Sequence, residues 1–530
     1  MRPKKTRKNI FFNNFYLRGS LTDSQIHNLE KVLQMGKVDK LKHVIPASAE
    51  LFKRDCEDIV LYDAQTLAVG MAYINPYFFI GDKPGLGKTI MSAAIFAQIR
   101  KKAFENGEKI GKLLVVTDNN HVSGIRRDYL RCGINLVPLK GGTKAIENEI
   151  KQFDIRDPLI DGIVTSWNSL KTNGFLMYYL DHQEYFTLGI MDETSALKND
   201  KTQLFSKADK IAMNFERNVF LNASTFETSI MDIYNQFQIL NPSVIPSKKF
   251  ITDRYVKYGR DSWFVTEYLP DPRTGIVSPQ RVMKFAYRIA DYTNQEELRN
   301  RLRYHYIART KADYSSDLPE KLYILHPVEM TERMRKAVAD TTQRYGEILN
   351  SPTTIDSNFQ FTTKTVPKLG VLLELFDSIA HERPVIYCYN TESQRVIRDE
   401  LVKKGYRVEI ISGSENTAGD GRDKVLQEFA EGYYDCIITN VKKAINIVGS
   451  QAMIFYDIPT NPQITYQIMG RIDRNNFDEK RTYHFLVYLN SPEMYNMQEL
   501  AHFREEHSSL FTGQHEEVYR QLIKQIENVL

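Results

Sequence analysis

A glycine-rich segment, GDKPGLGKTI at residues 81–90, constrains the fold of this chain more than any other feature. It follows the apolar run YFFI, and it precedes a stretch from Ile90 to Gly107 whose apolar residues recur at helical spacing. A buried strand, a glycine-rich loop and a helix in this order form a phosphate cradle. The segment therefore predicts a nucleotide site on a parallel α/β sheet.

Each part of the loop has an expected role. Backbone N–H groups of Gly85, Leu86 and Gly87 converge on phosphate oxygens, and glycine is needed because a Cβ would block so close an approach. Lys88 reaches the β- and γ-phosphates and Thr89 holds Mg²⁺. The expected small molecules are therefore a nucleoside triphosphate and Mg²⁺.

Short apolar runs that alternate with helical patterns predict buried parallel strands in two series. The first series includes YFFI, LLVVT at 113–117, GIVTS at 162–166, LGIMD at 188–192 and NVFLN at 218–222. The second series comprises PVIYCYN from Pro384, YRVEIIS at 406–412, DCIITN at 435–440, AMIFYD at 452–457 and TYHFLVYL at 482–489. Two α/β lobes are expected, of which the second lacks a phosphate loop. A length of 530 residues suits two or three domains.

An acidic pair and two arginines complete the expected chemistry. Asp192, at the end of a buried strand, is expected to hold Mg²⁺, and Glu193 to orient or deprotonate the attacking water. In QIMGRIDR, Arg471 and Arg474 are three residues apart and would share one face of a helix. With Gln467 they are expected to act from the second lobe, as an arginine finger that stabilises charge on the γ-phosphate.

Composition excludes several classes of protein. No apolar run approaches the roughly 18 residues that span a bilayer, and the basic N-terminus lacks the pattern of a secretory signal. The four cysteines are widely spaced, which argues against structural zinc and a disulfide framework and favours a reducing interior. With 70 basic and 66 acidic residues the net charge is only +4, so any nucleic-acid surface must be local.

Polar residues that follow the expected strands are candidates for positioning a nucleic-acid strand by its phosphates and sugars. They are Asn119, Asn120, Ser166, Trp167, Asn390, Thr391, Thr439 and Lys442. Residues 247–311 mix basic and aromatic side chains, which either face nucleic acid or, for the aromatics, form the small core of a helical protrusion. The basic run at residues 2–8 is either a further contact or a solvated tail.

These motifs together resemble the superfamily-two helicases, and among them the Swi/Snf-type duplex translocases, from about Tyr62 to about Glu493. YDAQTLAVG at 62–70 is similar to the Q motif, which implies that Gln65 recognises adenine. DKPGLGKT resembles the Swi/Snf phosphate loop, with Asp82 where generic loops carry their first glycine. IARTKADYSSDLPEK at 307–321 resembles the arginine-lysine brace between the lobes.

The chain departs from the family pattern at three motifs. The DEAH-like box is DETS, and the coupling motif is Asn222, Ala223, Ser224, Thr225 in place of threonine-glycine-threonine-proline. In the fifth motif, VKKAINI leaves Asn446 as the best match to a nucleic-acid contact. These departures are expected to affect the coupling of hydrolysis to movement more than ATP binding.

The resemblance implies two tandem RecA-like parallel-sheet lobes with a helical, basic insertion between them. The expected parts are an N-terminal extension (1–50), lobe 1 (51–240), a protrusion, brace and linker (241–367), lobe 2 (368–495) and a C-terminal helical segment (496–530).

The implied function is an ATP-dependent translocase or helicase acting on duplex or branched DNA in replication, recombination or repair. An RNA helicase, or a regulatory module with weak turnover, is the alternative. We expect an intracellular, soluble monomer or weak oligomer, in a bacterial cytoplasm or a nucleus, with replication or repair proteins as further partners and no membrane. The compact chain suits a phage or viral motor.

Overall fold

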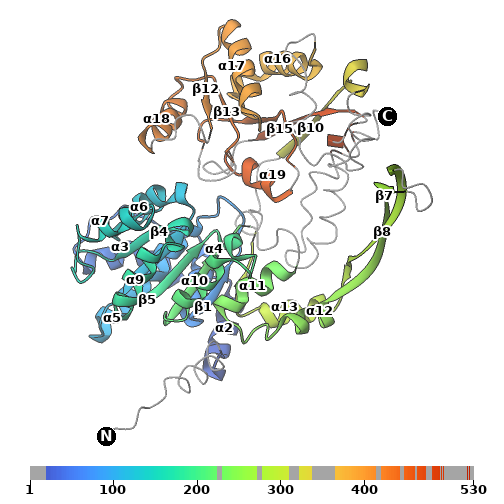
Figure 1. Cartoon of the computed structure of the whole chain (residues 1–530). Coiled ribbons are helices and arrows are strands. Elements are labelled where there is room, and N and C mark those ends of the chain that lie inside the picture. Colours follow the sequence, from blue (N-terminus) through green and yellow to red (C-terminus); the bar gives the residue numbers. More distant parts are fainter. Residues whose placement is uncertain are drawn as a thin grey trace. The chain divides into compact units, whose positions relative to one another are not determined.

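The computed structural model describes residues 20–223, 230–270, 277–309, 321–336, 365–412, 419–441, 447–459, 462–472 and 480–489, together with 491, 493, 494, 522 and 525. Between residues 260 and 291 it describes the backbone only. The described residues divide into two compact units, Met1–Val256 with Thr293–Ser316, and Lys257–Tyr292 with Asp317–Leu530. Each unit contains one large parallel sheet, drawn in Figure 1 in blue to green for the first and orange for the second.

The first lobe is built on a seven-stranded sheet whose neighbouring strands all run parallel. From one edge to the other, its strands are β3 (Leu136–Leu139), β4 (Gly162–Ser166), β2 (Lys112–Thr117), β5 (Phe186–Asp192), β6 (Arg217–Leu221), β1 (Tyr77–Ile80) and β9 (Tyr306–Ile307). The central strands are buried along nearly their whole length, as the continuous apolar runs predict.

Helices cover both faces of this sheet (Figure 1). The described helices of this unit are α2 (Asp23–Met35), α3 (Val44–Leu51), α4 (Asp63–Ile74), α5 (Lys88–Asn106), α6 (Val122–Arg131), α7 (Thr143–Ile150), α8 (Trp167–Leu170), α9 (Asn173–His182), α10 (Gln203–Ala212) and α11 (Met231–Leu240), with α12 (Lys248–Tyr255) and α13 (Gln295–Leu302) at the base of the insertion. Short 3₁₀ turns lie at η1 (Asp39–Leu41), η2 (Asn119–His121), η3 (Gln183–Tyr185) and η4 (Thr194–Leu197). Leu29, Val44 and Ile45 pack into the lobe's main core, so the described helices before residue 51 belong to the lobe.

The insertion after α12 differs from the helical one that the sequence suggests. Two long strands, β7 (Val256–Pro270) and β8 (Val277–Tyr292), pair in a sheet of their own between α12 and α13. Helices flank these two strands, with α12 before β7 and α13 after β8. The strand sequences are rich in β-branched and aromatic residues, which favour extended backbone.

The second lobe is built on a six-stranded parallel sheet. In order across the sheet, its strands are β10 (Lys321–Val328), β15 (Arg481–Tyr488), β14 (Ala452–Phe455), β11 (Val385–Tyr387), β13 (Cys436–Thr439) and β12 (Val408–Ile411). The surrounding helices are α16 (Pro367–Ile379), η6 (Ala380–Glu382), α17 (Thr391–Lys403), α18 (Gly419–Ala430) and α19 (Pro462–Met469).

Apolar layers lie on both faces of the second sheet. On β11, Val385 and Tyr387 belong to one core cluster and Ile386 to the other, as alternation along a strand requires. A buried ion pair, Lys368 Nζ to Glu493 Oε1 at 2.7 Å, ties the start of α16 to the chain after β15. The expected fold class, two parallel-sheet lobes of the tandem RecA-like type, is confirmed.

In the part of the chain that the structure describes, no helix is long and apolar enough to cross a membrane.

Candidate functional site

The phosphate loop connects β1 to the N-terminus of α5, as expected. Gly85 and Gly87 adopt left-handed backbone angles, with φ of 84° and 77°, which glycine reaches without steric cost. Gly87 is the N-cap of α5, so the free N–H groups and the positive end of the helix dipole lie at the loop. This donor set fits a phosphate group.

Gln65 connects the Q-motif helix to the loop. Its Nε2 donates to the Leu86 carbonyl at 3.1 Å, and its Oε1 accepts from the Tyr62 N–H at 3.0 Å. A Cβ at position 87 would come within 2.5 Å of Gln65 Nε2. A Cβ at this position would therefore have to displace the end of the Gln65 side chain, in addition to adopting the left-handed φ.

Lys88 is the first residue of α5, and its ammonium group points back over the loop. Its Nζ donates to the carbonyls of Asp82 at 2.5 Å and Lys83 at 3.3 Å. An ammonium group held above the cradle in this way is placed to meet phosphate oxygens. Thr89 follows at the second position of α5 and is partly buried.

Asp192 ends β5 and is separated from the phosphate-loop strand β1 by β6 alone. Since carboxyl ends of parallel strands lie at one edge of a sheet, Asp192 and the loop share that edge. Burial raises the pKa of Asp192 to about 7, and the Glu193 carboxylate acts in the same direction, opposed by a hydrogen bond from Thr117 and by the charge of Lys88. The adjacent carboxylates of Asp192 and Glu193 fit a divalent cation, because carboxylate oxygens are ligands that Mg²⁺ prefers.

Two residues from neighbouring strands hold Asp192. Thr117, at the end of β2, donates its hydroxyl to Asp192 Oδ2 at 2.8 Å, and Trp167, which follows β4, donates Nε1–H to the Asp192 carbonyl at 2.9 Å. Glu193 has a φ of 53°, an uncommon value for a residue with a Cβ. Such strain is typical of positions that are held for function.

The third residue of the DETS box takes part in a buried network that the sequence does not predict. Thr194 donates to Gln236 Oε1 at 2.6 Å, and Asn222, from the altered coupling motif, donates to the same oxygen at 3.5 Å. Gln236 lies on α11 and donates in turn to the Asp232 carbonyl at 2.8 Å. The carboxylate box and the coupling motif are thus connected through one glutamine. Ser224 and Thr225 lie outside the described residues.

A second feature that the sequence does not predict is the buried ion pair of Asp82 and Arg309. Asp82 is fully buried and Arg309 is 8% exposed. Oδ1 of Asp82 accepts the backbone N–H and the Nε–H of Arg309, both at 3.0 Å, and Oδ2 accepts Nη2–H at 2.5 Å. Arg309 also donates to the Ala64 carbonyl at the start of α4. The other brace residues, 310–320, lie outside the described part.

The arginine segment of lobe 2 differs from the expected helix. The helix α19 ends at Met469, and Arg471 lies in the turn that follows, where its carbonyl accepts from the Ile447 N–H at 3.0 Å. Gln467 and Arg471 are buried, at 4% and 3% exposure. Arg474 lies outside the described residues, so its role stays a prediction.

The strand-end candidates of lobe 1 differ in accessibility. Asn119 and Asn120 are exposed in η2, directly after β2. Ser166 is fully buried, and its hydroxyl caps α8 by accepting from the Ser169 N–H at 3.1 Å. Trp167 is 4% exposed. The strand β2 lies beside β5, and β4 lies beside β2. Since all three strands are parallel to β1, these residues share the carboxyl edge of the sheet with the phosphate loop.

The candidates of lobe 2 also follow the carboxyl ends of strands. Asn390 caps α17 by accepting from the Glu392 N–H at 2.8 Å, and Thr391 begins that helix as an exposed residue. Thr439 is buried and accepts from the Val441 N–H at 3.0 Å. Lys442 and Asn446 lie outside the described residues.

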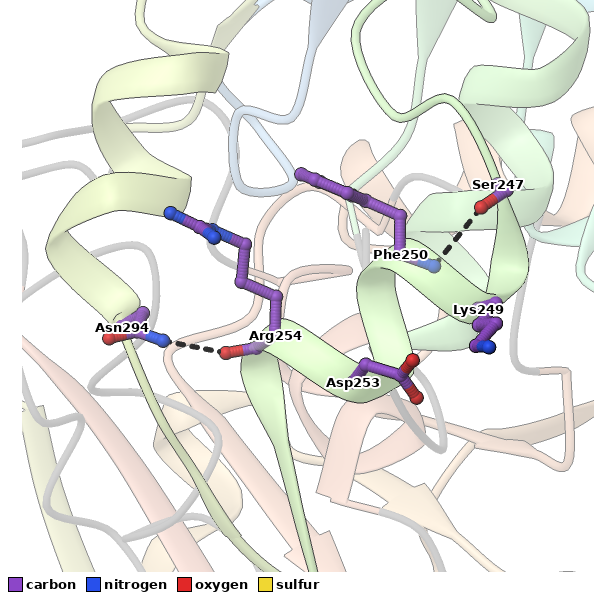
Figure 2. Close-up of a pocket in the computed structure, with 6 residues that line it drawn as sticks. All are labelled: Ser247, Lys249, Phe250, Asp253, Arg254 and Asn294. Atoms are coloured by element: carbon purple, nitrogen blue, oxygen red, sulfur yellow. Dashed lines mark hydrogen bonds between the residues drawn. The ribbon is translucent and has the colours of Figure 1, made fainter.

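A shallow pocket of about 490 Å³ lies on lobe 1 where α12 begins and α13 approaches it (Figure 2). It is lined by Ser247, Lys249, Phe250, Asp253, Arg254 and Asn294. Arg254 pairs with Glu297, with Nε to Oε2 at 2.7 Å. Lys248, Lys249 and Lys257 are exposed, and none of the three forms an ion pair with the described residues.

The chain matches one family model and several known proteins in sequence. Residues 367–476 match the family described as helicase conserved C-terminal domain. The chain is 20% identical over 477 residues to the chromodomain-helicase-DNA-binding protein 1-like of Danio rerio, covering 80% of this chain and 42% of the relative. It is 20% identical over 491 residues to the TATA-binding protein-associated factor MOT1 of Saccharomyces cerevisiae, covering 76% and 25%. The chain thus spans less than half the length of these relatives.

Among solved structures, the chain is similar to the SWI2/SNF2 ATPase core of Sulfolobus solfataricus in complex with dsDNA. The identity is 16% and the TM-score 0.37, with 86% of this chain and 92% of that chain covered. A TM-score of 0.37 is too low for this structural likeness to support an inference beyond the sequence matches.

Proposed function

We propose that the chain is a superfamily-two helicase of the Swi/Snf type, which hydrolyses ATP at its first lobe and uses the cycle to move along duplex or branched DNA. The observation that carries this proposal is the position of Asp192. It shares a sheet edge with the phosphate loop, and it is held by residues from β2 and β4, the strands whose ends are candidates for DNA contact.

In this mechanism the loop residues bind ATP through its phosphates. Backbone N–H groups of residues 85–87 and the Lys88 ammonium compensate phosphate charge, and Gln65 lies beside the loop for the adenine. Bound Mg²⁺, held by Thr89 and Asp192, would supply further compensation of charge. Glu193 orients the attacking water and accepts its proton.

Residues of the second lobe complete the site when the cleft closes. Gln467, Arg471 and Arg474 are proposed to contact the nucleotide from that lobe, so that hydrolysis depends on closure. After hydrolysis the arginines no longer have a phosphate partner and the cleft reopens. If the lobes alternate their grip on the DNA backbone, each cycle advances the protein along it.

On the DNA side, the exposed Asn119, Asn120 and Thr391 are best placed to contact phosphates directly. The other candidates, Ser166, Trp167, Asn390, Thr439, Lys442 and Asn446, are proposed to support or extend this track. Trp167 has a further role in the proposal. Because its indole holds the Asp192 carbonyl, a strand that displaces Trp167 also moves the catalytic carboxylate.

One ATPase assay tests the proposal and separates it from the alternatives. Turnover is measured without nucleic acid and with single-stranded DNA, duplex DNA, branched DNA or RNA. We expect the strongest stimulation by duplex or branched DNA, and its loss in Lys88→Ala and Arg474→Ala. A stronger response to RNA would identify an RNA helicase. ATP binding without turnover would identify a regulatory module.

The exposed lysines at the start of α12 are proposed to extend the DNA surface (Figure 2). Each lysine that binds a DNA phosphate makes the slope of log affinity against log salt concentration steeper by about 0.9. We expect Lys248→Glu/Lys249→Glu to weaken duplex binding and to make this dependence shallower. The matched control, Lys144→Glu/Lys151→Glu at α7, makes the same charge change at the other end of lobe 1 and should leave binding unchanged. Equal effects of both double variants would show that only net charge matters.

A further inference from the structure

The Asp82–Arg309 ion pair joins the phosphate loop to the last described residues of lobe 1 before the chain continues to lobe 2. Arg309 follows the edge strand β9, whose Ile307 carbonyl accepts from the Gly81 N–H at 2.6 Å. The Arg309 carbonyl accepts from the Lys83 N–H at 2.9 Å. The next described residue, Lys321, already belongs to the second sheet. Arg309 therefore lies at the root of the segment that connects the lobes.

Several hydrogen bonds fix the geometry of the Asp82–Arg309 pair. Asp82 receives three hydrogen bonds from Arg309, and the arginine fork reaches both carboxylate oxygens. A further N–H of the guanidinium bonds the Ala64 carbonyl, one residue before Gln65. Burying two charges is costly unless the geometry is good, and an apolar pair of similar volume often serves stability equally well. Stability alone therefore does not account for charges at these two positions.

Asp82 also contacts the group that meets the phosphates. Its backbone carbonyl accepts from Lys88 Nζ at 2.5 Å, while its carboxylate holds Arg309. A phosphate in the cradle must draw on the same ammonium group, because Lys88 supplies the loop's side-chain cation. A phosphate bound in the cradle therefore alters the hydrogen bond between Lys88 Nζ and the Asp82 carbonyl. The Asp82 carboxylate is in turn hydrogen-bonded to Arg309.

We propose that Asp82 and Arg309 are a positioning pair that transmits phosphate occupancy of the loop to the segment joining the two lobes. The proposal rests on the proposed function, since it assumes that nucleotide brings the lobes together. In this role, neither Asp82 nor Arg309 contacts the reacting atoms. Asp82 senses the position of Lys88, and Arg309 holds the end of β9, from which the chain continues to lobe 2.

The test measures closure and nucleotide affinity in the same protein. Donor and acceptor dyes are placed on Glu108→Cys in lobe 1 and Val402→Cys in lobe 2, both exposed, with Cys56→Ser as background. Energy transfer is recorded while a non-hydrolysable ATP analogue with Mg²⁺ is added. Arg309→Lys keeps the charge but removes the fork that reaches both oxygens of Asp82.

We expect Arg309→Lys to bind the analogue within about threefold of wild type, while the closing equilibrium shifts by about tenfold toward the open state. The matched control is Arg100→Lys. Arg100 also forms a buried pair, with Asp161 at 3.1 Å, but it lies 12 residues along α5 from Lys88, or about 18 Å. This control should close like the wild type. If Arg309→Lys does not fold, Asp82→Asn makes the same test from the other partner.

Closure that is unchanged in a variant that binds the analogue would overturn the proposal. The proposal would also be overturned if affinity for the analogue and the closing equilibrium fell by the same factor, because the pair would then only support the cradle. A wild-type protein that binds the analogue without any change in energy transfer would contradict closure itself, and with it the proposed function.

Discussion

Gly87→Ala tests whether the cradle and the Q-motif glutamine form one site. The new Cβ would lie 2.5 Å from Gln65 Nε2, closer than real Cβ contacts allow, and alanine would have to adopt a φ of 77°. The left-handed conformation costs an alanine about 1–2 kcal/mol. Displacing Gln65 also removes its hydrogen bond to Leu86, about 0.5–1.5 kcal/mol.

Together these costs come to about 1.5–3.5 kcal/mol, or a loss of about 10- to 400-fold in affinity for ATP. The affinity is measured by titration with a fluorescent ATP analogue, and kcat/KM for ATP is measured beside it. Gly107→Ala is the matched control at the other end of α5. Gly107 has a similar φ of 68° but nothing within 4 Å of its added Cβ. It should lose stability by about 1–2 kcal/mol and keep wild-type affinity for ATP.

The Gln65→Ala background separates the clash from the backbone strain. Without the Gln65 side chain, Gly87→Ala should cost only the strain, so its effect on affinity should shrink by about threefold or more. A Gly87→Ala protein with wild-type affinity would refute the reasoning about the cradle. An effect of the same size in both backgrounds would refute the role given to Gln65.

Two further predictions concern buried polar groups. Thr117→Val removes a hydrogen bond to Asp192. At about pH 8, where a carboxyl with a pKa of about 7 is mostly charged, this bond is worth about 1.5–3 kcal/mol, so kcat should fall by about 10- to 100-fold. Thr165→Val, which removes a bond to a backbone carbonyl on the neighbouring strand, should retain kcat, and equal losses would contradict this. Burial lowers the pKa of His305 and of His484 to about 4, below the ordinary value of 6.5. The unfolded chain therefore binds more protons between these values, so stability is fully present above pH 6.5 and falls by about 3 kcal/mol for each histidine as the pH drops to 4. Denaturant unfolding at pH 7.5 and 5 checks this, and His305→Asn or His484→Asn should flatten the dependence; no change in midpoint between the two pH values would contradict it.

The elements that the sequence predicts well are those with a strong local signal. The strands of YFFI, GIVTS and LGIMD are continuous apolar runs, and the structure places β1, β4 and β5 at them. The loop residues need left-handed backbone at Gly85 and Gly87, which only glycine adopts readily. In these segments, local sequence and tertiary structure require the same conformation.

Elements with weak local signals are not predicted. The strand β3 contains Pro138 and pairs only at the edge of the sheet, where proline is tolerated, and β9 has two residues. The prediction of a helical insertion is wrong at the long strands β7 and β8, because a mixture of basic and aromatic residues indicates a binding surface without indicating its backbone. A β-strand presents such residues on its two faces as well as a helix presents them on its surface.

The contacts that organise the site are not predictable from spacing. Asp82 and Arg309 are 227 positions apart, and Thr194 and Gln236 are 42 apart. In the sequence, Asp82 stands out only as a departure from generic phosphate loops. Its partner is identified only by the fold, which places β9 beside β1. Long-range polar pairs carry no periodic signal, so they follow from tertiary structure alone.

Movement along duplex DNA is the central claim, and displacement of a third strand from a triplex tests it most directly. The triplex is placed at increasing distances from one end of the duplex, and release of the third strand is followed with time. We expect release that requires ATP, shows a delay growing with distance, and is absent in Lys88→Ala. DNA-stimulated ATP hydrolysis without release, or release with the same delay at every distance, would contradict the account.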